Sequence, residues 1–288
     1  MSGFALALIL CAAFVHAGWN YLLKKSGGGI GFVWLFGALS SLFYLPLALG
    51  LVLLTPVSIT PAGMALIVAS GVIHTGYYLL LDRGYRSGDL SIVYPIARAT
   101  GPLITIVAAI AFLDEHLSIP ALCGAGLVIG GAFFLSAGAG KLRESQPRVW
   151  HGIGFALLTG CTIAAYTLVD KQAVSAAAVP PLVFDWMMNL VRIALTTPLA
   201  LRRREQMARA WKEHRRTAIA VALLNPLSYI LVLTAMVFTP VSYVAPAREI
   251  SILFAALLGA RLLAEGQVLR RSACAGAMAA GVILLAIY

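Results

Sequence analysis

Apolar residues run along this chain in stretches of about 20, and the short breaks between the stretches hold most of the charged residues. A run of this length predicts a helix that crosses a bilayer, because about 20 residues are needed to span the hydrocarbon core. We therefore expect an all-α polytopic membrane protein with ten transmembrane helices. The runs place these helices at 3–23, 31–54, 62–82, 90–112, 118–138, 151–170, 181–200, 217–238, 241–262 and 269–287.

The ten expected helices form two halves that repeat one another. The segments 91–98 (SIVYPIAR) and 242–248 (SYVAPAR) share the pattern Ser-x-Val-x-Pro followed by an Arg. Upstream, Tyr78 lies as far before the first segment as Tyr229 lies before the second, and Lys24 falls opposite Lys171. The sequence therefore predicts a first five-helix repeat, a cytoplasmic linker and a second five-helix repeat, with the ranges 1–138, 139–149 and 150–288.

An odd number of helices per repeat fixes how the repeats are related. The second repeat must enter the membrane from the side opposite to the first, so the two form an inverted pair. Many secondary transporters are built this way, with the solute site near the midplane where the repeats meet. We expect a central cavity there and solute movement by alternating access.

The distribution of basic residues predicts an orientation. Of the 21 Lys and Arg residues, 17 lie in the breaks after the odd-numbered helices or at the helix ends beside them. Cytoplasmic loops carry this excess, so both termini are predicted to be periplasmic. The same topology accounts for the net charge of +10 without nucleic acid as a partner. The basic stretch 202–216 could lie as an amphipathic helix on membrane lipid, or act only as a topology signal.

Two arginines, Arg98 and Arg248, fall inside apolar runs at matching places in the two repeats. An arginine within the membrane is costly and usually faces a cavity or a partner. One interpretation is that one or both hold an anionic group of a solute through paired donors. The alternative is a structural role, with Glu249 next to Arg248 as the neutralising group.

Aromatic and polar residues in the other runs predict the walls of the cavity. His74 and Tyr78 lie one turn apart on the same helix face, and Tyr229 is the repeat counterpart of Tyr78. The tryptophans could instead be interfacial belt residues, and a single His is more often a satisfied buried group than a ligand. The candidate substrate-binding residues are Trp19, Asn20, His74, Tyr78, Tyr94, Arg98, Tyr166, Trp186, Tyr229, Tyr243 and Arg248.

Proline and glycine add candidate hinge and packing positions. Pro95 and Pro246 lie near the starts of their helices, and Gly101-Pro102 is a second irregular point in the fourth helix. Irregular backbone is tolerated in a membrane where it lines a cavity. Small residues at 126, 130, 277 and 281 predict close helix packing in the last helix of each repeat.

Several chemistries lack the motifs they need. The sequence has no GxxxxGK[ST] loop for ATP, no metal-ligand cluster, and no paired nucleophile and base, so we expect no cofactor and no enzyme activity. The four cysteines lie in apolar runs as packing residues. If transport is uphill, protons are the expected coupling ion, and the candidate carriers are His16, His74, Asp185 and Glu249.

Taken together, two repeats with a Pro-containing fourth helix, a Glu after it (Glu115 in FLDEHL and Glu265 in LLAE) and a Gly-rich last helix resemble the drug/metabolite transporter superfamily, EamA type. Within that family the chain looks most like bacterial exporters of aromatic and other amino acids, the YddG type. The resemblance implies an inner-membrane protein with a central cavity, and an amino acid as its small-molecule substrate. We expect a monomer and leave a dimer open.

Three functions remain open from the sequence. The first is a secondary transporter that exports amino acids. The second is an exporter of organophosphates, phosphonates or nucleotide sugars, for which two arginines would also serve. The third is a membrane-embedded enzyme, which inverted repeats make the least expected.

Overall fold

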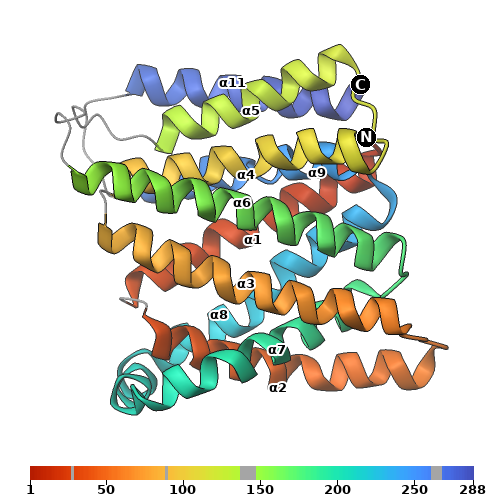
Figure 1. The fold of residues 1–288 in the computed structure, drawn as a ribbon. Helices are drawn as coiled ribbons and strands as arrows, with labels where there is room; N and C mark the ends of the chain where they lie inside the picture. Colours follow the sequence, from red (N-terminus) through yellow and green to blue (C-terminus); the bar gives the residue numbers. More distant parts are fainter. Residues whose placement is uncertain (27–28, 88–89, 137–146, 261–267) are drawn as a thin grey trace.

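The computed structural model describes residues 1–26, 29–87, 90–136, 147–260 and 268–288, and all regular structure within these ranges is helical (Figure 1). This confirms the predicted all-α class. The helices are α1 (Gly3–Lys25), α2 (Ile30–Leu54), α3 (Pro61–Ser87), α4 (Leu90–Phe112), α5 (Ile119–Ser136), α6 (Pro147–Ser175), α7 (Pro181–Leu201), α8 (Arg204–Phe238), α9 (Val241–Ala247), α10 (Ile250–Ala260) and α11 (Val268–Ile287).

These eleven segments make the ten expected membrane spans, because α9 and α10 together form the ninth. Among the described residues, seven helices are long and apolar enough to cross a membrane by length and composition. The others are less apolar or shorter for identifiable reasons. Helix α7 carries Asp185, Asn189 and Arg192, the ninth span is divided, and α11 has its apolar part at Ser272–Ile287.

The contacts between helices show the inverted two-repeat arrangement directly. Helix α3 packs on α6, and its repeat counterpart α8 packs on α1. In the same way α4 packs on α6 while α10 packs on α1, and α2 packs on α8 while α7 packs on α3. In two further contacts, α2 with α7 and α5 with α11, the two helices are each other's repeat counterparts. Exchanging the repeats therefore leaves these contacts unchanged. Each repeat therefore completes the packing of the other around a shared centre.

The break in the ninth span differs from the single helix expected over 241–262. Pro246 has no N–H to donate, so the regular ladder fails there. The next residues form shorter i to i−3 bonds instead, from Glu249 N to Pro246 O (3.0 Å) and from Ser251 N to Arg248 O (3.1 Å). Helix α4, by contrast, runs unbroken through Pro95 and Pro102. The irregular backbone thus lies only in the second of the two repeated segments, at Arg248 and Glu249.

A second difference concerns the packing of α5 against α11. A Cβ built at Gly281 would lie 2.5 Å from the carbonyl oxygen of Gly124, and one at Gly124 would lie 2.7 Å from the carbonyl oxygen of Gly281. Nothing lies within 4 Å of a Cβ at Gly126 or Gly130. The prediction was correct for Gly281 but wrong for Gly126 and Gly130, because these two lie on the other face of α5.

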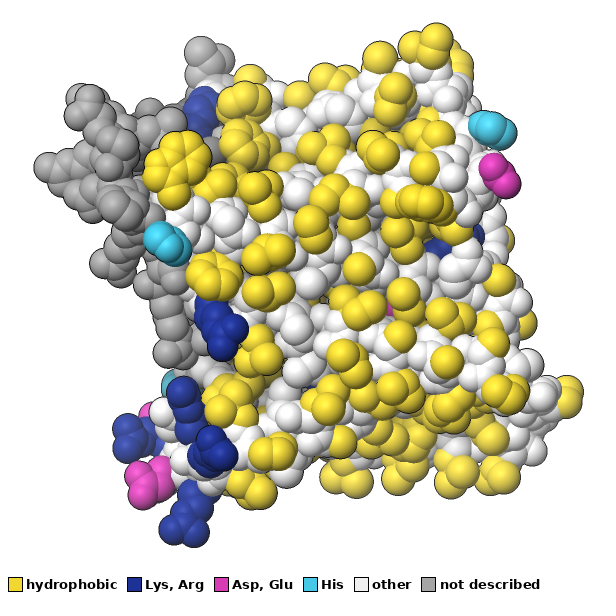
Figure 2. Space-filling view, in the orientation of Figure 1, with side chains coloured by type: hydrophobic (Ala, Val, Ile, Leu, Met, Phe, Trp, Pro, Cys, Tyr) yellow, Lys and Arg dark blue, Asp and Glu magenta, His cyan; other side chains and the backbone are white. Residues whose placement is uncertain are grey.

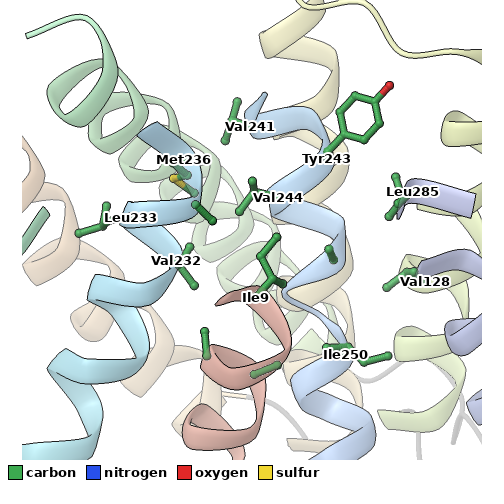
Figure 3. Packing of buried hydrophobic residues seen from close by; sticks show 14 of the residues in the cluster. Ile9, Val128, Val232, Leu233, Met236, Val241, Tyr243, Val244, Ile250 and Leu285 are labelled. Atoms are coloured by element: carbon green, nitrogen blue, oxygen red, sulfur yellow. The ribbon is translucent and has the colours of Figure 1, made fainter. Parts of the chain in front are cut away.

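The centre of the molecule is a continuous apolar core to which both repeats contribute. Figure 3 shows Ile9 of α1, Val232 and Leu233 of α8 and Val244 of α9 gathered at one place, with Val128 of α5 and Leu285 of α11 beside α9. All six side chains are nearly inaccessible to solvent. Dispersion contacts of this density hold the helices in register, so the polar groups among them are placed rigidly.

The surface divides into an apolar middle and two polar ends. In Figure 2 hydrophobic side chains cover the broad middle of the visible face, and dark blue Lys and Arg side chains gather at one edge. The chain termini lie together at the opposite edge, with the amino group of Met1 bonded to Ala286 O at 3.2 Å (Figure 1). The basic segment at the start of α8 is helical and bends at His214. The orientation of these two ends in a cell stays a prediction.

Two sequence predictions fall on residues outside the described ranges. Most of the linker 139–149 belongs to the undescribed segment 137–146, and the second Glu motif, 262–265, lies within 261–267. The first Glu motif is described and is treated with the site below.

Candidate solute-binding site

A small cavity lies where the two repeats meet. Its volume is about 20 Å³, room for little more than one water molecule. Helix α1 lines one side, α8 another, and the break between α9 and α10 closes it. The lining residues are Ala12, Ala13, His16, Arg98, Ser228, Tyr229, Val232, Arg248 and Ser251. The two repeat arginines thus meet at one cavity, as their positions in the sequence predicted.

Arg98 is neutralised by an acid from the other repeat. Its Nε lies 3.0 Å from Oε2 of Glu249, and both side chains are largely buried, at 13% and 6% exposure. Its Nη2 also donates to Ser251 Oγ at 3.4 Å. The carboxylate neutralises the charge of the buried arginine, although Nε and Oε2 do not have the geometry of a hydrogen bond. Arg98 therefore fits a structural role that joins the repeats.

Arg248 is placed differently. It forms no ion pair with any described residue, although Glu249 is its neighbour in the chain. Its guanidinium carbon lies 5.4 Å from the centre of the Tyr229 ring, a cation–π arrangement. An arginine that lines a cavity and keeps its donors free of acids is suited to bind an anion from outside the protein.

Stacked aromatic rings form a wall beside the cavity. The ring of His74 stacks on that of Tyr166, with 3.9 Å between centres and 28° between planes, and meets Tyr229 edge-on at 5.7 Å. Tyr77 packs on the edge of Tyr166. Nδ1 of His74 lies 3.0 Å from the carbonyl oxygen of Ser70, which fixes the ring. The predicted residues His74, Tyr166 and Tyr229 are thus brought together from α3, α6 and α8.

A second polar cluster lies between α2, α3 and α7. Arg192 donates to the Asn189 side chain and to the hydroxyl of Tyr78 at 3.4 Å. Asn189 donates in turn to Gly37 O at 3.0 Å. Trp186 belongs to the same region, with Nε1 donating to Ser41 O at 2.9 Å. Tyr78 and Trp186 therefore do not line the central cavity, and their polar atoms have partners among the described residues.

Four further predicted residues lie around the edges of the site. Trp19 donates to Ser228 Oγ at 3.2 Å and so contacts a residue that lines the cavity. Asn20 donates to His16 O at 2.9 Å within its own helix. Tyr94 lies near both Arg98 and Glu249. Tyr243 is apart, because its hydroxyl donates to Tyr288 O at 3.2 Å and its ring points away from Val232 and Ile9 (Figure 3).

The four candidate proton carriers lie at four places: His16 on α1, His74 on α3, Asp185 on α7 and Glu249 in the break between α9 and α10. His16 lines the cavity and meets Trp19 edge-on at 4.9 Å, and Glu249 is paired with Arg98. Asp185 is buried on α7, in the region of Arg192. These residues do not form one continuous cluster with Glu249. Within the described ranges there is also no group of His, Cys, Asp or Glu that could hold a metal ion.

Sequence reasoning missed one buried acid, Asp170 on α6. It is 0% exposed and accepts a hydrogen bond from the hydroxyl of Tyr229. The signal was present, because Asp170 is an acid inside a predicted membrane span. The comparison of the repeats matches Lys171 with Lys24, but it matches Asp170 with Leu23, which is not an acid. A search for residues shared by both repeats therefore passes over Asp170.

The turn between α8 and α9 is held from both sides by charged groups. Lys171 Nζ donates to Met236 O (2.7 Å) and Thr239 O (3.0 Å) at the end of α8. Glu115 accepts from the N–H groups of Val241 and Ser242, each at 2.8 Å, at the start of α9. A cation at a helix C-terminus and an anion at an N-terminus both stabilise the ends. The Glu of the first repeat motif therefore anchors the broken span of the second repeat.

Comparison with known proteins agrees with this architecture. The model of the EamA-like transporter family matches residues 3–137 and 150–287. A search among curated proteins gave no match. A solved structure described only as "Crystal structure of protein" is similar over 99% of this chain and 96% of its own, with a TM-score of 0.73 and 15% identity. At that identity the similarity concerns the fold alone.

Proposed function

Because this chain belongs to the EamA-like transporter family, of the drug/metabolite transporter superfamily, we propose that it is a secondary transporter that exports amino acids by alternating access. The nearest functional type would be the exporters of aromatic and other amino acids, the YddG type. The solute would bind in the central cavity between the repeats, in the inner membrane.

The observation that carries this proposal is the unequal state of the two repeat arginines. Arg98 is paired with Glu249, whereas Arg248 lines the cavity and has no acidic partner among the described residues. One available guanidinium matches one carboxylate, through two parallel hydrogen bonds. A doubly charged phosphate ester would be better served by two free arginines. The pairing of Arg98 therefore supports an amino acid over a phosphate.

The aromatic wall supports a solute with an apolar side chain. Tyr229 lines the cavity, and His74 and Tyr166 stack behind it. Rings arranged edge to face offer both apolar surface and a few polar atoms, which suits an amphipathic molecule. The hydroxyl groups of Ser228 and Ser251 at the cavity could accept from the amino group of the solute.

Transport also requires the cavity to open. A volume of about 20 Å³ is too small for any amino acid, so the solute must enter in another conformation. The break between α9 and α10 supports such a change, because Arg248 sits on backbone outside the regular helices. Rocking of one repeat against the other would then expose the arginine to one side of the membrane at a time.

Solute counterflow in liposomes tests the proposal. Liposomes that contain the purified protein would be loaded with an excess of unlabelled L-phenylalanine or L-leucine. The same amino acid, labelled, would then be added outside and its uptake measured. Competitors would include the amide of phenylalanine, which lacks the carboxylate, a sugar phosphate and an aminoalkyl phosphonate. We expect exchange of the amino acids and weak competition by the amide. Exchange of phosphates alone, or equal competition by the amide, would contradict the proposed solute class.

A further inference from the structure

Asp170 is a buried acid that the proposed solute contacts do not use. Its side chain is 0% exposed, and one carboxyl oxygen, Oδ2, accepts from the Tyr229 hydroxyl. The other oxygen, Oδ1, is buried and makes no hydrogen bond within the part of the chain that the structure describes. No described Lys or Arg forms an ion pair with this carboxyl group. It is thus isolated from water, and beyond the Tyr229 hydroxyl only the Ser70 hydroxyl lies beside it, without a well-aligned bond to Oδ1.

The groups that face Asp170 come from every neighbouring helix. Tyr229 of α8 bonds to Asp170 and carries Arg248 over its ring, and Arg248 is the cation that acts on this carboxyl group. The next residue, Lys171, donates instead to Met236 O and Thr239 O. Asp185 of α7 is a second acid on the same side, and the pair of Arg98 with Glu249 is already neutral overall. The remaining titratable or polar neighbours are Ser70 and His74 of α3 and Tyr166 of its own helix.

A carboxylate in this setting would be costly. An ionised carboxyl group moved out of water without a paired cation is strongly disfavoured, and such groups generally take up a proton instead. We propose that Asp170 is a proton-binding site of this protein, and that it binds its proton together with the anionic group of the solute at Arg248. The coupling to the solute rests on the proposed function, whereas the proton site at Asp170 does not.

The coupling follows from the positions of three side chains. Arg248 lies over the ring of Tyr229, and the hydroxyl of the same Tyr229 bonds to Asp170. While Arg248 is free, its positive charge favours the ionised form of Asp170. When a carboxylate occupies Arg248, that charge is cancelled, and proton binding to Asp170 becomes more favourable. Linkage is reciprocal, so a protonated Asp170 also raises the affinity for the anionic solute.

The sign of the pH effect is therefore fixed. Solute affinity should rise as pH falls, by up to about tenfold per pH unit over the range in which Asp170 titrates. Proton and solute would then bind together, so export would have to run down the solute's own outward gradient, and an inward proton gradient would oppose it. A competing arrangement, in which the proton displaces the solute, predicts the opposite slope.

The proton site itself can be tested without any solute. Infrared difference spectra between acid and alkaline pH, on the full-length protein in liposomes, report the carbonyl stretch of protonated carboxyl groups. We expect one band that is lost in Asp170→Asn, kept in Asp185→Asn, and shifted in Tyr229→Phe, which removes the hydrogen bond to Oδ2. If Asp170→Asn fails to fold, isotope labelling of aspartate carboxyl carbons in wild type and Tyr229→Phe protein makes the same assignment. A spectrum in which no band depends on Asp170 or responds to Tyr229→Phe would overturn the proposal.

The coupling is tested by proton uptake when L-phenylalanine binds, followed with a pH dye in weakly buffered solution. We expect uptake by wild type and by the matched control Asp185→Asn, and binding without uptake by Asp170→Asn. Binding without uptake by the wild type would overturn the coupling. If L-phenylalanine does not bind at all, the proposed function fails and the coupling with it, while the infrared band still decides the proton site.

Discussion

Arg98 and Glu249 come from different repeats, and the ion pair between them, 3.0 Å long, joins the fourth span to the broken ninth span. The sequence alternative had Glu249 neutralising its neighbour Arg248. Consecutive residues point to different sides of a helical backbone, so Glu249 cannot easily turn back to Arg248. The acid instead reaches across the interface, and this leaves Arg248 available at the cavity.

The Arg98–Glu249 pair predicts a specific pattern of stability. Replacing one partner leaves the other charge buried without compensation, which costs about 3–5 kcal/mol. We expect Arg98→Leu to lower the stability by about this amount, measured as thermal or denaturant unfolding in detergent. The double variant Arg98→Leu/Glu249→Leu should recover most of the loss, because an apolar pair leaves no buried charge. Additive losses in the double variant would contradict the pairing.

The close contact of α5 with α11 predicts different results for two glycines. Gly281→Ala places a methyl group 2.5 Å from a backbone oxygen, so the helices must separate, at a cost of about 1–3 kcal/mol. Gly126→Ala is the matched control, since nothing lies within 4 Å of its Cβ. It should be neutral or stabilising by up to about 1 kcal/mol through helix propensity. Thermal unfolding in detergent compares them, and equal effects would contradict the described packing face.

Much of the fold follows from the sequence because the bilayer imposes it. A span must be about 20 apolar residues long and must satisfy its own backbone, so most of the spans could be located to within about five residues. Helix α8 begins at Arg204, well before the expected 217, because the basic segment ahead of the span is helical as well. The ninth was expected as one helix, because hydropathy does not register a missing N–H. Pro246 was recognised, but Pro95 has the same place in its repeat and leaves α4 unbroken. Tertiary packing decides between them.

The site was harder to predict, for a related reason. Repetition drew together Arg98, Arg248 and Tyr229, and the structure places all three on one cavity, while their role in binding stays a prediction. It also favoured Tyr78, which bonds to Arg192 instead, and it passed over Asp170, which has no acidic counterpart. An inverted pair of repeats is symmetric in its backbone but not in its polar side chains. The residues that break the symmetry are therefore the ones that repetition cannot find.

The anchor formed by Glu115 gives a further prediction. Its two oxygens each accept an N–H at the start of α9, and loss of such a cap costs about 0.5–2 kcal/mol. We expect Glu115→Ala to lower the unfolding temperature, and Glu115→Gln, which keeps one acceptor oxygen, to lower it less. Glu213→Ala is the control, since Glu213 is exposed on the first part of α8. An unchanged unfolding temperature for Glu115→Ala would contradict the role of this anchor.

The measurement that tests the central claim most directly is L-phenylalanine counterflow in liposomes by wild type, Arg248→Gln and Tyr243→Phe protein. Arg248→Gln removes the free cation without leaving a buried acid unpaired, so it should fold and lose at least about tenfold in exchange, as for a lost charged hydrogen bond. Tyr243→Phe changes a hydroxyl outside the cavity and should exchange like wild type. Full exchange by Arg248→Gln would contradict the assignment of the solute site to Arg248.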